Sequence, residues 1–272
     1  MANSFLQYNP GYELYIFLID QVNSRFNLNS FSPYKILEIS EINVPDFDLM
    51  AAQYSVIELN CAMKPFVAQW LFAQYQPDLL LYIDSDTLVF SSFEEVEKSL
   101  LENDLVITPH FTHPYPDNHL LPRERDILRS GLYNAGFIGM RNSANTNHFL
   151  SWWAGHMKSE CYYNFAEGMG LDQIWINLVP LLFKGVQINS DPGLNVAYWN
   201  LHERKISIRD GSYWVNNEYP LVFLHISGYQ FNEPLNISRH QNRYSFSDHL
   251  VLQNLFALYI DKVKENGYDF YS

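Results

Sequence analysis

The chain has 272 residues, of which 47% are hydrophobic and 16% aromatic, so it can bury a large core and is not intrinsically disordered. Its formal net charge of −13 argues against nucleic acid or an anionic membrane surface as the main partner. Cys61 and Cys161 have no partner motif, which fits a reduced, cytoplasmic protein without a disulfide framework. No stretch approaches the roughly 18 apolar residues of a membrane span, so none is expected.

Apolar runs and turn residues predict alternating strands and helices in the first part of the chain. The expected strands are residues 12–19, 35–39, 79–83, 104–108, 133–140, 186–189, 205–209 and 221–225. The expected helices are residues 45–54, 60–76, 93–101, 146–162, 170–183 and 246–266. Residues 109–122 contain four prolines and are expected to form an irregular loop. With no Gly/Ser-rich linker and no internal repeat, residues 1–272 are predicted to form a single α/β domain with an irregular C-terminal part.

Two carboxylates at a strand end carry the first functional signal. The apolar run Leu79–Ile83 reads as a buried strand and is followed by Asp84 and Asp86. At the carboxyl end of a strand, such side chains point into the crevice where open α/β sheets bind ligands. Because two neighbouring anions repel each other, a shared divalent cation, Mg²⁺ or Mn²⁺, is expected to join them to substrate phosphates.

The local pattern Asp84-Ser85-Asp86-Thr87 fits two chemistries. In haloacid-dehalogenase phosphatases the first Asp is a nucleophile and the second an acid/base. In nucleotide-sugar transferases of the GT-A fold, the same Asp-x-Asp holds a metal ion on a diphosphate. The chain contains no Gly-Asp-x-x-x-Asp string, and at least one strand precedes the motif, which disfavours the phosphatase.

Three further motifs occur in the order found in one family. They are Asn134-Ala135-Gly136 within a strand that closes on Asn142, Gly170-Leu171-Asp172-Gln173 at a helix start, and His225-Ile226-Ser227-Gly228 at a late strand end. With Asp84-Ser85-Asp86, they resemble the glycosyltransferase 8-like group of GT-A glycosyltransferases, over roughly residues 10–245. The resemblance implies an α/β GT-A fold, a Rossmann-like mixed sheet flanked by helices.

The resemblance also implies roles for individual residues. Asp84, Asp86 and His225 would bind the metal ion, Mn²⁺ or Mg²⁺, with the imidazole favouring Mn²⁺. Asp172 would lie at the reacting centre and would be the base if the reaction inverts. The donor substrate would be bound by Ser85, Asn134, Gly136, Gln173, Gly228 and Tyr229. Residue chemistry adds three candidates: Lys64 at a helix start for the nucleotide or its phosphates, and His240 or Arg243, in a basic cluster of an acidic chain, for the leaving diphosphate.

The predicted function is therefore that of a hexosyltransferase. It would transfer a sugar from a UDP-linked nucleotide sugar to an acceptor that is a carbohydrate or is lipid-linked. Such a step belongs to polysaccharide biosynthesis, in the cytoplasm or at the inner face of a membrane. Two alternatives remain: a Mg²⁺-dependent phosphatase with Asp84 as the nucleophile, and a non-catalytic sugar-nucleotide-binding protein.

Two further expectations concern the edges of the site. Residues 195–202 combine amides and aromatic rings, as a sugar-binding rim would, and the loop of residues 109–122 is expected on the acceptor side. Phe5 and Leu6 look like the tail of a helix, so the chain is expected to start one strand later than GT-A proteins do. That would leave an open sheet edge or groove beside residues 12–19 or 79–83.

Overall fold

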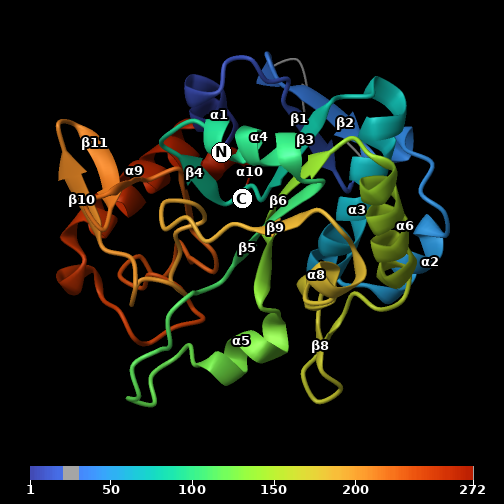
Figure 1. Ribbon diagram of the computed structural model, residues 1–272. Helices are drawn as coiled ribbons and strands as arrows, with labels where there is room; N and C mark the ends of the chain where they lie inside the picture. Colours follow the sequence, from blue (N-terminus) through green and yellow to red (C-terminus); the bar gives the residue numbers. More distant parts are fainter. Residues whose placement is uncertain (21–30, 272) are drawn as a thin grey trace.

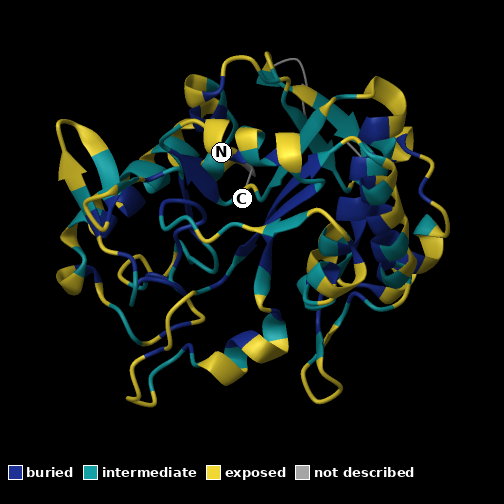
Figure 2. Ribbon diagram, in the orientation of Figure 1, coloured by how far each residue is buried: buried dark blue, intermediate teal, exposed yellow. Residues whose placement is uncertain are grey.

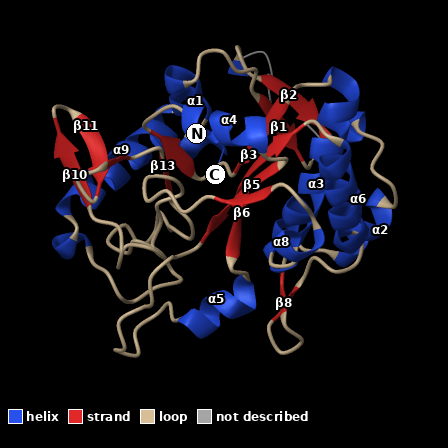
Figure 3. Ribbon diagram, viewed as in Figure 1, coloured by secondary structure: helices blue, strands red, loops and turns tan. Residues whose placement is uncertain are grey.

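Strands β3, β6, β5 and β9 form the central sheet, in that spatial order. Their bounds are Leu79–Ile83, Tyr133–Arg141, Leu105–Pro109 and Val186–Ile188, respectively. Strand β6 runs antiparallel to both of its neighbours, whereas β5 and β9 are parallel. This computed structural model describes residues 1–20 and 31–271, and it confirms the predicted mixed α/β class (Figure 3).

Helices cover the two faces of this sheet (Figure 1). On one face α3 (Val56–Tyr75) packs against α6 (Ala144–Met157), and on the other α4 (Glu94–Glu102) contacts β5 and β6. Alternate side chains of β3 supply the two cores: Leu80 and Tyr82 pack in the core beneath α3 and α6, and Leu81 in the core beneath α4. The strand period of two thus places one apolar row on each face, and the sheet interior is buried (Figure 2).

Helix α3 begins earlier than its sequence indicated. Ser55 caps it reciprocally with Glu58: the Ser55 hydroxyl accepts from the Glu58 amide at 3.4 Å, and the Glu58 carboxylate accepts from the Ser55 amide at 2.8 Å. Pro65 was expected in the first turn but lies inside the helix. Its missing N–H costs one backbone hydrogen bond there, which tertiary packing of this buried segment outweighs.

Most of the other helices are short. The remaining described helices are α1 (Ala2–Tyr8), α2 (Phe47–Gln53), α5 (Glu124–Ser130), α7 (Gln173–Ile176), α8 (Val179–Leu182), α9 (Leu250–Glu265) and α10 (Tyr268–Tyr271). Of these, α5 was not predicted, and the single helix expected over residues 170–183 is instead the separate pair α7 and α8. The loop before α5 is irregular, as expected, with no helix or strand between residues 110 and 123.

Small sheets complete the strands. Their members are the parallel pair β1 (Tyr15–Leu18) and β2 (Lys35–Glu38), the antiparallel pair β4 (Thr87–Val89) and β13 (Phe223–His225), the hairpin β7 (Tyr163–Asn164) and β8 (Met169–Gly170), and the meander β10 (Ile206–Arg209), β11 (Ser212–Val215) and β12 (Tyr219–Pro220). The meander packs with α9 at the side of the molecule opposite α3 and α6 (Figure 1). None of the helices in the described part of the chain is long and apolar enough to cross a membrane.

Strands β1 and β3 each have a single ladder partner among residues 1–20 and 31–271: β2 for β1, and β6 for β3. Both strands nevertheless contribute to the same two cores. Phe17 of β1 packs in the core beneath α3 and α6, as Leu80 of β3 does. Leu14, just before β1, packs in the core beneath α4, as Leu81 does. Each strand therefore has one edge without a ladder in the described chain. That the chain starts one strand late stays a prediction.

Candidate metal centre

Two short ladders bring the predicted metal ligands together. The Asp84 amide donates to the Gly136 carbonyl at 2.8 Å and so continues the pairing of β3 with β6. Three residues later β4 begins, and its Thr87 lies opposite His225 of β13. The Asp86 carbonyl accepts from the Ile226 amide at 2.8 Å, which fixes the turn between the strands against β13. Residues that are far apart in sequence therefore meet at the carboxyl end of β3.

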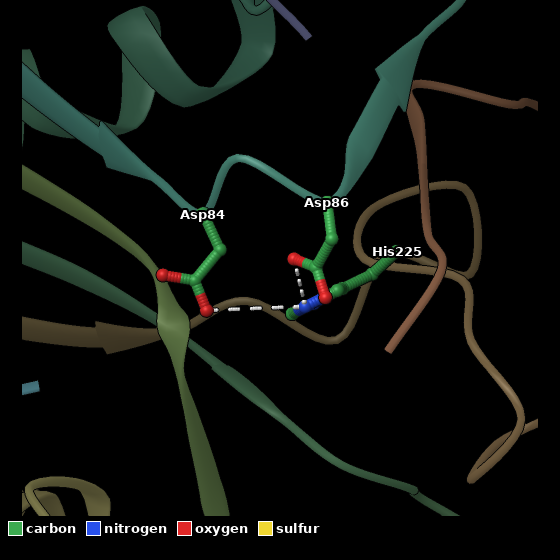
Figure 4. A group of neighbouring side chains, drawn as sticks. All are labelled: Asp84, Asp86 and His225. Carbon is green, nitrogen blue, oxygen red and sulfur yellow. Dashed lines mark ion pairs between the residues drawn. The ribbon is translucent and has the colours of Figure 1, made fainter. Parts of the chain in front are cut away.

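The three side chains converge on one point (Figure 4). The His225 Nε2 atom lies 3.1 Å from Asp86 Oδ1 and 3.9 Å from Asp84 Oδ2. One ligand atom from each of the three residues lies within 4.8 Å of the others. His225 is almost wholly buried, with 3% of its side chain exposed, whereas Asp84 and Asp86 are 29% and 40% exposed. The carboxylates therefore face solvent while the imidazole forms the floor.

This donor set suits a divalent cation. Two carboxylates and one imidazole are ligands that Mn²⁺ and Mg²⁺ accept, with the imidazole shifting the balance toward Mn²⁺. Gly136 keeps the space between the ligands open: a Cβ atom there would lie 2.5 Å from His225 Cε1 and 2.7 Å from Asp84 Oδ2. The residues present thus fit a metal ion in both chemistry and space.

Mutual attraction favours the charged forms of His225 and Asp86, although His225 is almost wholly buried and Asp86 is partly buried. Burial would lower the pKa of His225, but the facing charges of Asp86 and Asp84 and the hydrogen bond to Asp86 raise it. Burial would likewise raise the pKa of Asp86, but the attraction of His225 outweighs it and lowers that pKa. A metal ion competes with the proton on His225, so metal binding is expected to strengthen as pH rises through the raised pKa.

Behind the carboxylates lies a buried lysine. Lys64 of α3 has 8% of its side chain exposed, and its Nζ lies 2.8 Å from Asp172 Oδ2 and 3.5 Å from Asp84 Oδ1. It also donates to the Ala135 carbonyl at 3.1 Å. The contact with Asp172 is an ion pair by distance, although its angle lies outside hydrogen-bond geometry. Burial would lower the pKa of Lys64, but the charges of Asp172 and Asp84 raise it well above its usual value.

Tyr82 completes the surroundings of Asp84. Its hydroxyl donates to Asp84 Oδ1 at 2.6 Å, and its ring lies 5.0 Å from the Lys64 ammonium. Burial and the neighbouring Asp84 charge raise the pKa of Tyr82, so the hydroxyl remains a donor. The alternation of strand β3 could have indicated this contact, because residues 82 and 84 share a face.

The Asn134–Gly136 segment and Gln173 lie beside the same centre. The Asn134 Oδ1 atom accepts from the Gly136 amide at 3.1 Å, and Asn134 is 7% exposed. Gln173 Oε1, at the start of α7, lies 3.4 Å from both Asn134 Nδ2 and the Ala135 amide. The structure therefore joins these three predicted donor-site residues in one network next to Asp84.

Gly228 and His240 lie in close contact with each other. Gly228 has φ of +71°, and a Cβ atom there would lie 2.5 Å from His240 Cδ2 and 2.7 Å from Ser238 Oγ. The glycine is therefore required both by its backbone conformation and by this close approach. His240 is exposed and stacks on Tyr198, with ring centroids 6.0 Å apart.

The structure places two of the predicted donor-site residues in other contacts. Tyr229 packs against Phe231 and Phe256 in the C-terminal core. Arg243 forms hydrogen bonds with the loop before α5: its Nη2 donates to the carbonyls of Leu120 and Pro122, at 2.8 and 3.0 Å. Its Nη1 donates to the Asn118 side chain and the Pro116 carbonyl, at 2.8 and 3.4 Å.

Ser85 is exposed in the turn between the two carboxylates. Asn195, in the segment expected to form a sugar-binding rim, is fully buried, and Trp199 and Asn200 are buried as well. The Asn195 Oδ1 atom lies 3.1 Å from His225 Nδ1, so this residue touches the metal centre from below. Sequence reasoning missed that contact. The one local signal was an asparagine after a Pro-Gly turn, since asparagine tolerates the left-handed conformation observed here, with φ of +58°.

Comparisons with known proteins give two relatives by sequence, both from Bacillus subtilis (strain 168) and both named as uncharacterized. YfnF is 30% identical over 176 residues, covering 62% of this chain and 55% of YfnF. YfnD is 22% identical over 280 residues, covering 97% of this chain and 83% of YfnD. The chain thus spans about half the length of YfnF. No protein-family model matches it.

Solved structures with some likeness are glycosyltransferases. GlyE of Streptococcus pneumoniae TIGR4 has a TM-score of 0.45 at 14% identity, covering 91% of this chain and 53% of GlyE. The galactosyltransferase LgtC, solved with donor and acceptor sugar analogs, has a TM-score of 0.38 at 17% identity, covering 70% and 68%. A glycosyltransferase involved in the glycosylation of the major capsid of PBCV-1 has a TM-score of 0.40 at 10% identity, covering 72% of this chain and 82% of that chain. TM-scores this low do not carry a functional assignment, which has to come from the site.

Proposed function

We propose that this protein is a metal-dependent glycosyltransferase of GT-A type that uses a nucleotide sugar as donor. The observation that carries the proposal is the convergence of Asp84, Asp86 and His225 within 4.8 Å at the carboxyl end of β3. A divalent ion on these ligands would supply positive charge to a departing diphosphate. The chain is strongly acidic, so local positive charge is what phosphate binding requires of it.

The charge balance of the site supports a bound cation. Asp84, Asp86 and Asp172 face a single lysine, Lys64, so with His225 neutral the group carries a formal charge of about −2. A diphosphate would be repelled by that charge. With a divalent cation the group becomes neutral, and the donor can approach. Metal ion and nucleotide are therefore expected to bind together, the metal first or as a complex with the nucleotide.

The network beside the metal centre would hold the donor sugar. Asn134 and Gln173 offer amide donors and acceptors to sugar hydroxyls, and Gly136 lets the backbone approach closely. Asp172 lies at the reacting centre in this proposal, and Lys64 holds its carboxylate in place at 2.8 Å. Transfer with retention of configuration needs no separate base, and with inversion Asp172 is the base.

The structure supports different roles for the remaining residues expected to bind the donor. Ser85 is free to meet the nucleotide because it is exposed between the metal ligands, and Gly228 with His240 lies where a diphosphate could meet the backbone. Arg243 has four hydrogen bonds to the loop before α5, so we assign to it the shaping of that loop. Tyr229 supports this part of the chain by packing in the C-terminal core.

The finer assignment follows the sequence motifs. We propose a UDP-linked hexose as donor, a carbohydrate or glycolipid as acceptor, and Mn²⁺ or Mg²⁺ as the metal ion, in a cytoplasmic step of polysaccharide biosynthesis.

Metal-dependent nucleotide binding tests the proposal. UDP should raise the thermal unfolding temperature of the wild-type protein in the presence of Mn²⁺ and much less in its absence, because a ligand that binds the folded state stabilises it by mass action. Asp86→Ala should lose this Mn²⁺-dependent shift while remaining folded. Asp78→Ala is the matched control, because Asp78 is an exposed carboxylate beside the opposite end of β3. It should behave as the wild type does.

The outcomes separate the alternatives. Unchanged Mn²⁺-dependent affinity in Asp86→Ala would show that this carboxylate is not a ligand. Hydrolysis of a generic phosphoester that requires Asp84 would favour the phosphatase. Metal-dependent UDP binding without release of UDP from any UDP-hexose, even with acceptor sugars present, would favour a binding protein.

A further inference from the structure

Asn195 lies at the centre of a buried chain of hydrogen bonds that ends on the metal centre. It is fully buried and has φ of +58°, and the neighbouring Val196 is fixed on β13. Val196 accepts from the His225 amide at 2.8 Å through its carbonyl, and its own amide donates to the Phe223 carbonyl at 3.1 Å. This backbone pairing brings the side-chain amide of Asn195 next to the His225 ring.

The Asn195 side chain has three polar neighbours. Its Oδ1 lies 3.1 Å from His225 Nδ1. Its Nδ2 lies 3.0 Å from Asn134 Oδ1 and 2.9 Å from Thr108 Oγ1. All of these groups are buried, with exposed fractions between 0% and 7%, so water cannot replace a missing partner.

The backbone of Gly136 fixes the direction of every bond in this chain. Its N–H can only donate, and it donates to Asn134 Oδ1 at 3.1 Å, so that atom is an oxygen. The group of Asn195 that faces Asn134 Oδ1 must then be the NH₂ group. The opposite atom of Asn195 is consequently the oxygen, and it can only accept a hydrogen bond from His225. His225 Nδ1 therefore carries a hydrogen, so Nε2 is the nitrogen whose lone pair would face Asp84, Asp86 and a metal ion once a metal ion has replaced its proton.

We propose that Asn195 is a positioning residue that fixes the tautomer of His225 for metal binding and at the same time fixes the amide of Asn134. The inference rests on the proposed function, because it assigns His225 to a metal ion and Asn134 to the donor sugar. A metal-bound histidine commonly donates its second N–H to a fixed acceptor, and loss of that acceptor weakens metal binding by about 10–100-fold. Here one amide links two subsites that the sequence places far apart.

Two substitutions at this position separate the two roles. In Asn195→Gly both contacts are lost, while the left-handed backbone is kept without strain. In Asn195→Asp a carboxylate oxygen still accepts from His225 Nδ1, but the second oxygen cannot donate to Asn134 Oδ1. The glycine variant should lose metal affinity and donor affinity, whereas the aspartate variant should lose donor affinity alone.

The primary test is Mn²⁺ binding without nucleotide, followed by electron paramagnetic resonance of the free ion. Asn195→Gly should bind Mn²⁺ about 10–100-fold more weakly than the wild type, and Asn195→Asp should stay within a few-fold. At saturating Mn²⁺, Asn195→Asp should bind a UDP-sugar about tenfold more weakly, the cost of one unsatisfied buried polar contact. Asn216→Gly is the control, because Asn216 also has positive φ but lies just after β11, where its Oδ1 accepts from the Lys205 amide at 2.8 Å.

A second readout does not depend on variants that may unfold. With Mg²⁺ or Cd²⁺ bound to the wild-type protein, imidazole ¹⁵N spectra should show the His225 proton on Nδ1, in slow exchange with water. Equal Mn²⁺ affinity for folded Asn195→Gly and wild type, or a proton on Nε2, overturns the inference while leaving the proposed function intact. If the wild type itself binds no divalent ion, the proposed metal site is wrong, and the inference is overturned with it.

Discussion

The two parts of the chain that build the site hold their side chains in different ways. The first part presents Asp84 from the end of β3, Lys64 from α3 and Asp172 from the N-cap of α7. Backbone hydrogen bonds of the sheet and of α3 hold the first two in position. The second part presents His225 from β13, a strand of 3 residues, in a region of loops. There, buried polar side chains, rather than neighbouring strands, form hydrogen bonds with the backbone. Asn200 Nδ2 donates to the Asn195 carbonyl at 3.0 Å, and Arg204 Nη1 donates to the Leu194 carbonyl at 2.6 Å.

This difference predicts how each part should respond to a mutation. In the regular part, backbone hydrogen bonds survive a side-chain change, so damage should come from charges left without a partner. In the irregular part, one side chain often satisfies several backbone groups, so its loss should loosen a loop before it unfolds the domain. Three substitutions test that contrast, in decreasing order of expected effect.

The largest effect is expected for Lys64→Met. Asp172 is 4% exposed, and removal of Lys64 leaves its carboxylate buried beside Asp84 without a cation. Breaking a buried ion pair in this way costs about 3–5 kcal/mol of unfolding free energy. Urea denaturation measures it. Lys64→Met/Asp172→Leu, which removes both charges, should recover part of the loss.

A surface pair provides the control for Lys64. Lys158 lies 2.8 Å from Asp46, the same separation as in the buried pair, but 41% and 54% of the two side chains are exposed. Lys158→Met should therefore cost less than about 1 kcal/mol. Similar costs for Lys64→Met and Lys158→Met would show that burial does not make the Lys64 pair important.

The same contrast explains what the sequence could predict. Asp84 and Asp86 follow an apolar run, so strand pattern alone located them, and His225 closes another such run. Arg243 was expected on the diphosphate because a cation in an acidic chain suggests an anionic ligand. Its actual partners are three backbone carbonyls and the Asn118 side chain in the loop before α5, a set that no local residue pattern predicts. Asn195 was expected in a sugar-binding rim because amides and aromatic rings gather in residues 195–202. It is instead buried, since the loops fold over β13 in a way that no local pattern shows.

A smaller effect is expected at the junction of the two parts, for His110→Gln under acid. Burial lowers the pKa of His110 from its ordinary value of 6.5 to about 4. Between those pH values the unfolded chain binds a proton there that the folded chain does not, so stability falls as pH falls through this window, by about 3 kcal/mol. The glutamine variant lacks this loss and should show a correspondingly flatter dependence of unfolding free energy on pH from 6.5 to 4.

His148→Gln is the control for His110, because His148 is exposed on helix α6. Its pH dependence of stability should follow that of the wild type. A His110→Gln curve parallel to the wild-type curve would contradict the assignment of a neutral, buried imidazole at His110.

The smallest global effect is expected for Arg243→Lys. The variant keeps the charge but loses the planar fork that serves Leu120, Pro122 and Asn118 together, so an ammonium group can satisfy only part of the set. The unfolding free energy should fall by about 1–2 kcal/mol. Amide hydrogen exchange should quicken in residues 117–121 while the amides of β6 stay protected, because the sheet ladder does not depend on this side chain. Arg239→Lys is the control, since Arg239 is exposed and its guanidinium has one hydrogen bond, to His240. Exchange that quickens equally in β6 and in the loop would mean that Arg243 holds the domain as a whole, and the division between a ladder-held and a side-chain-held part would then be wrong.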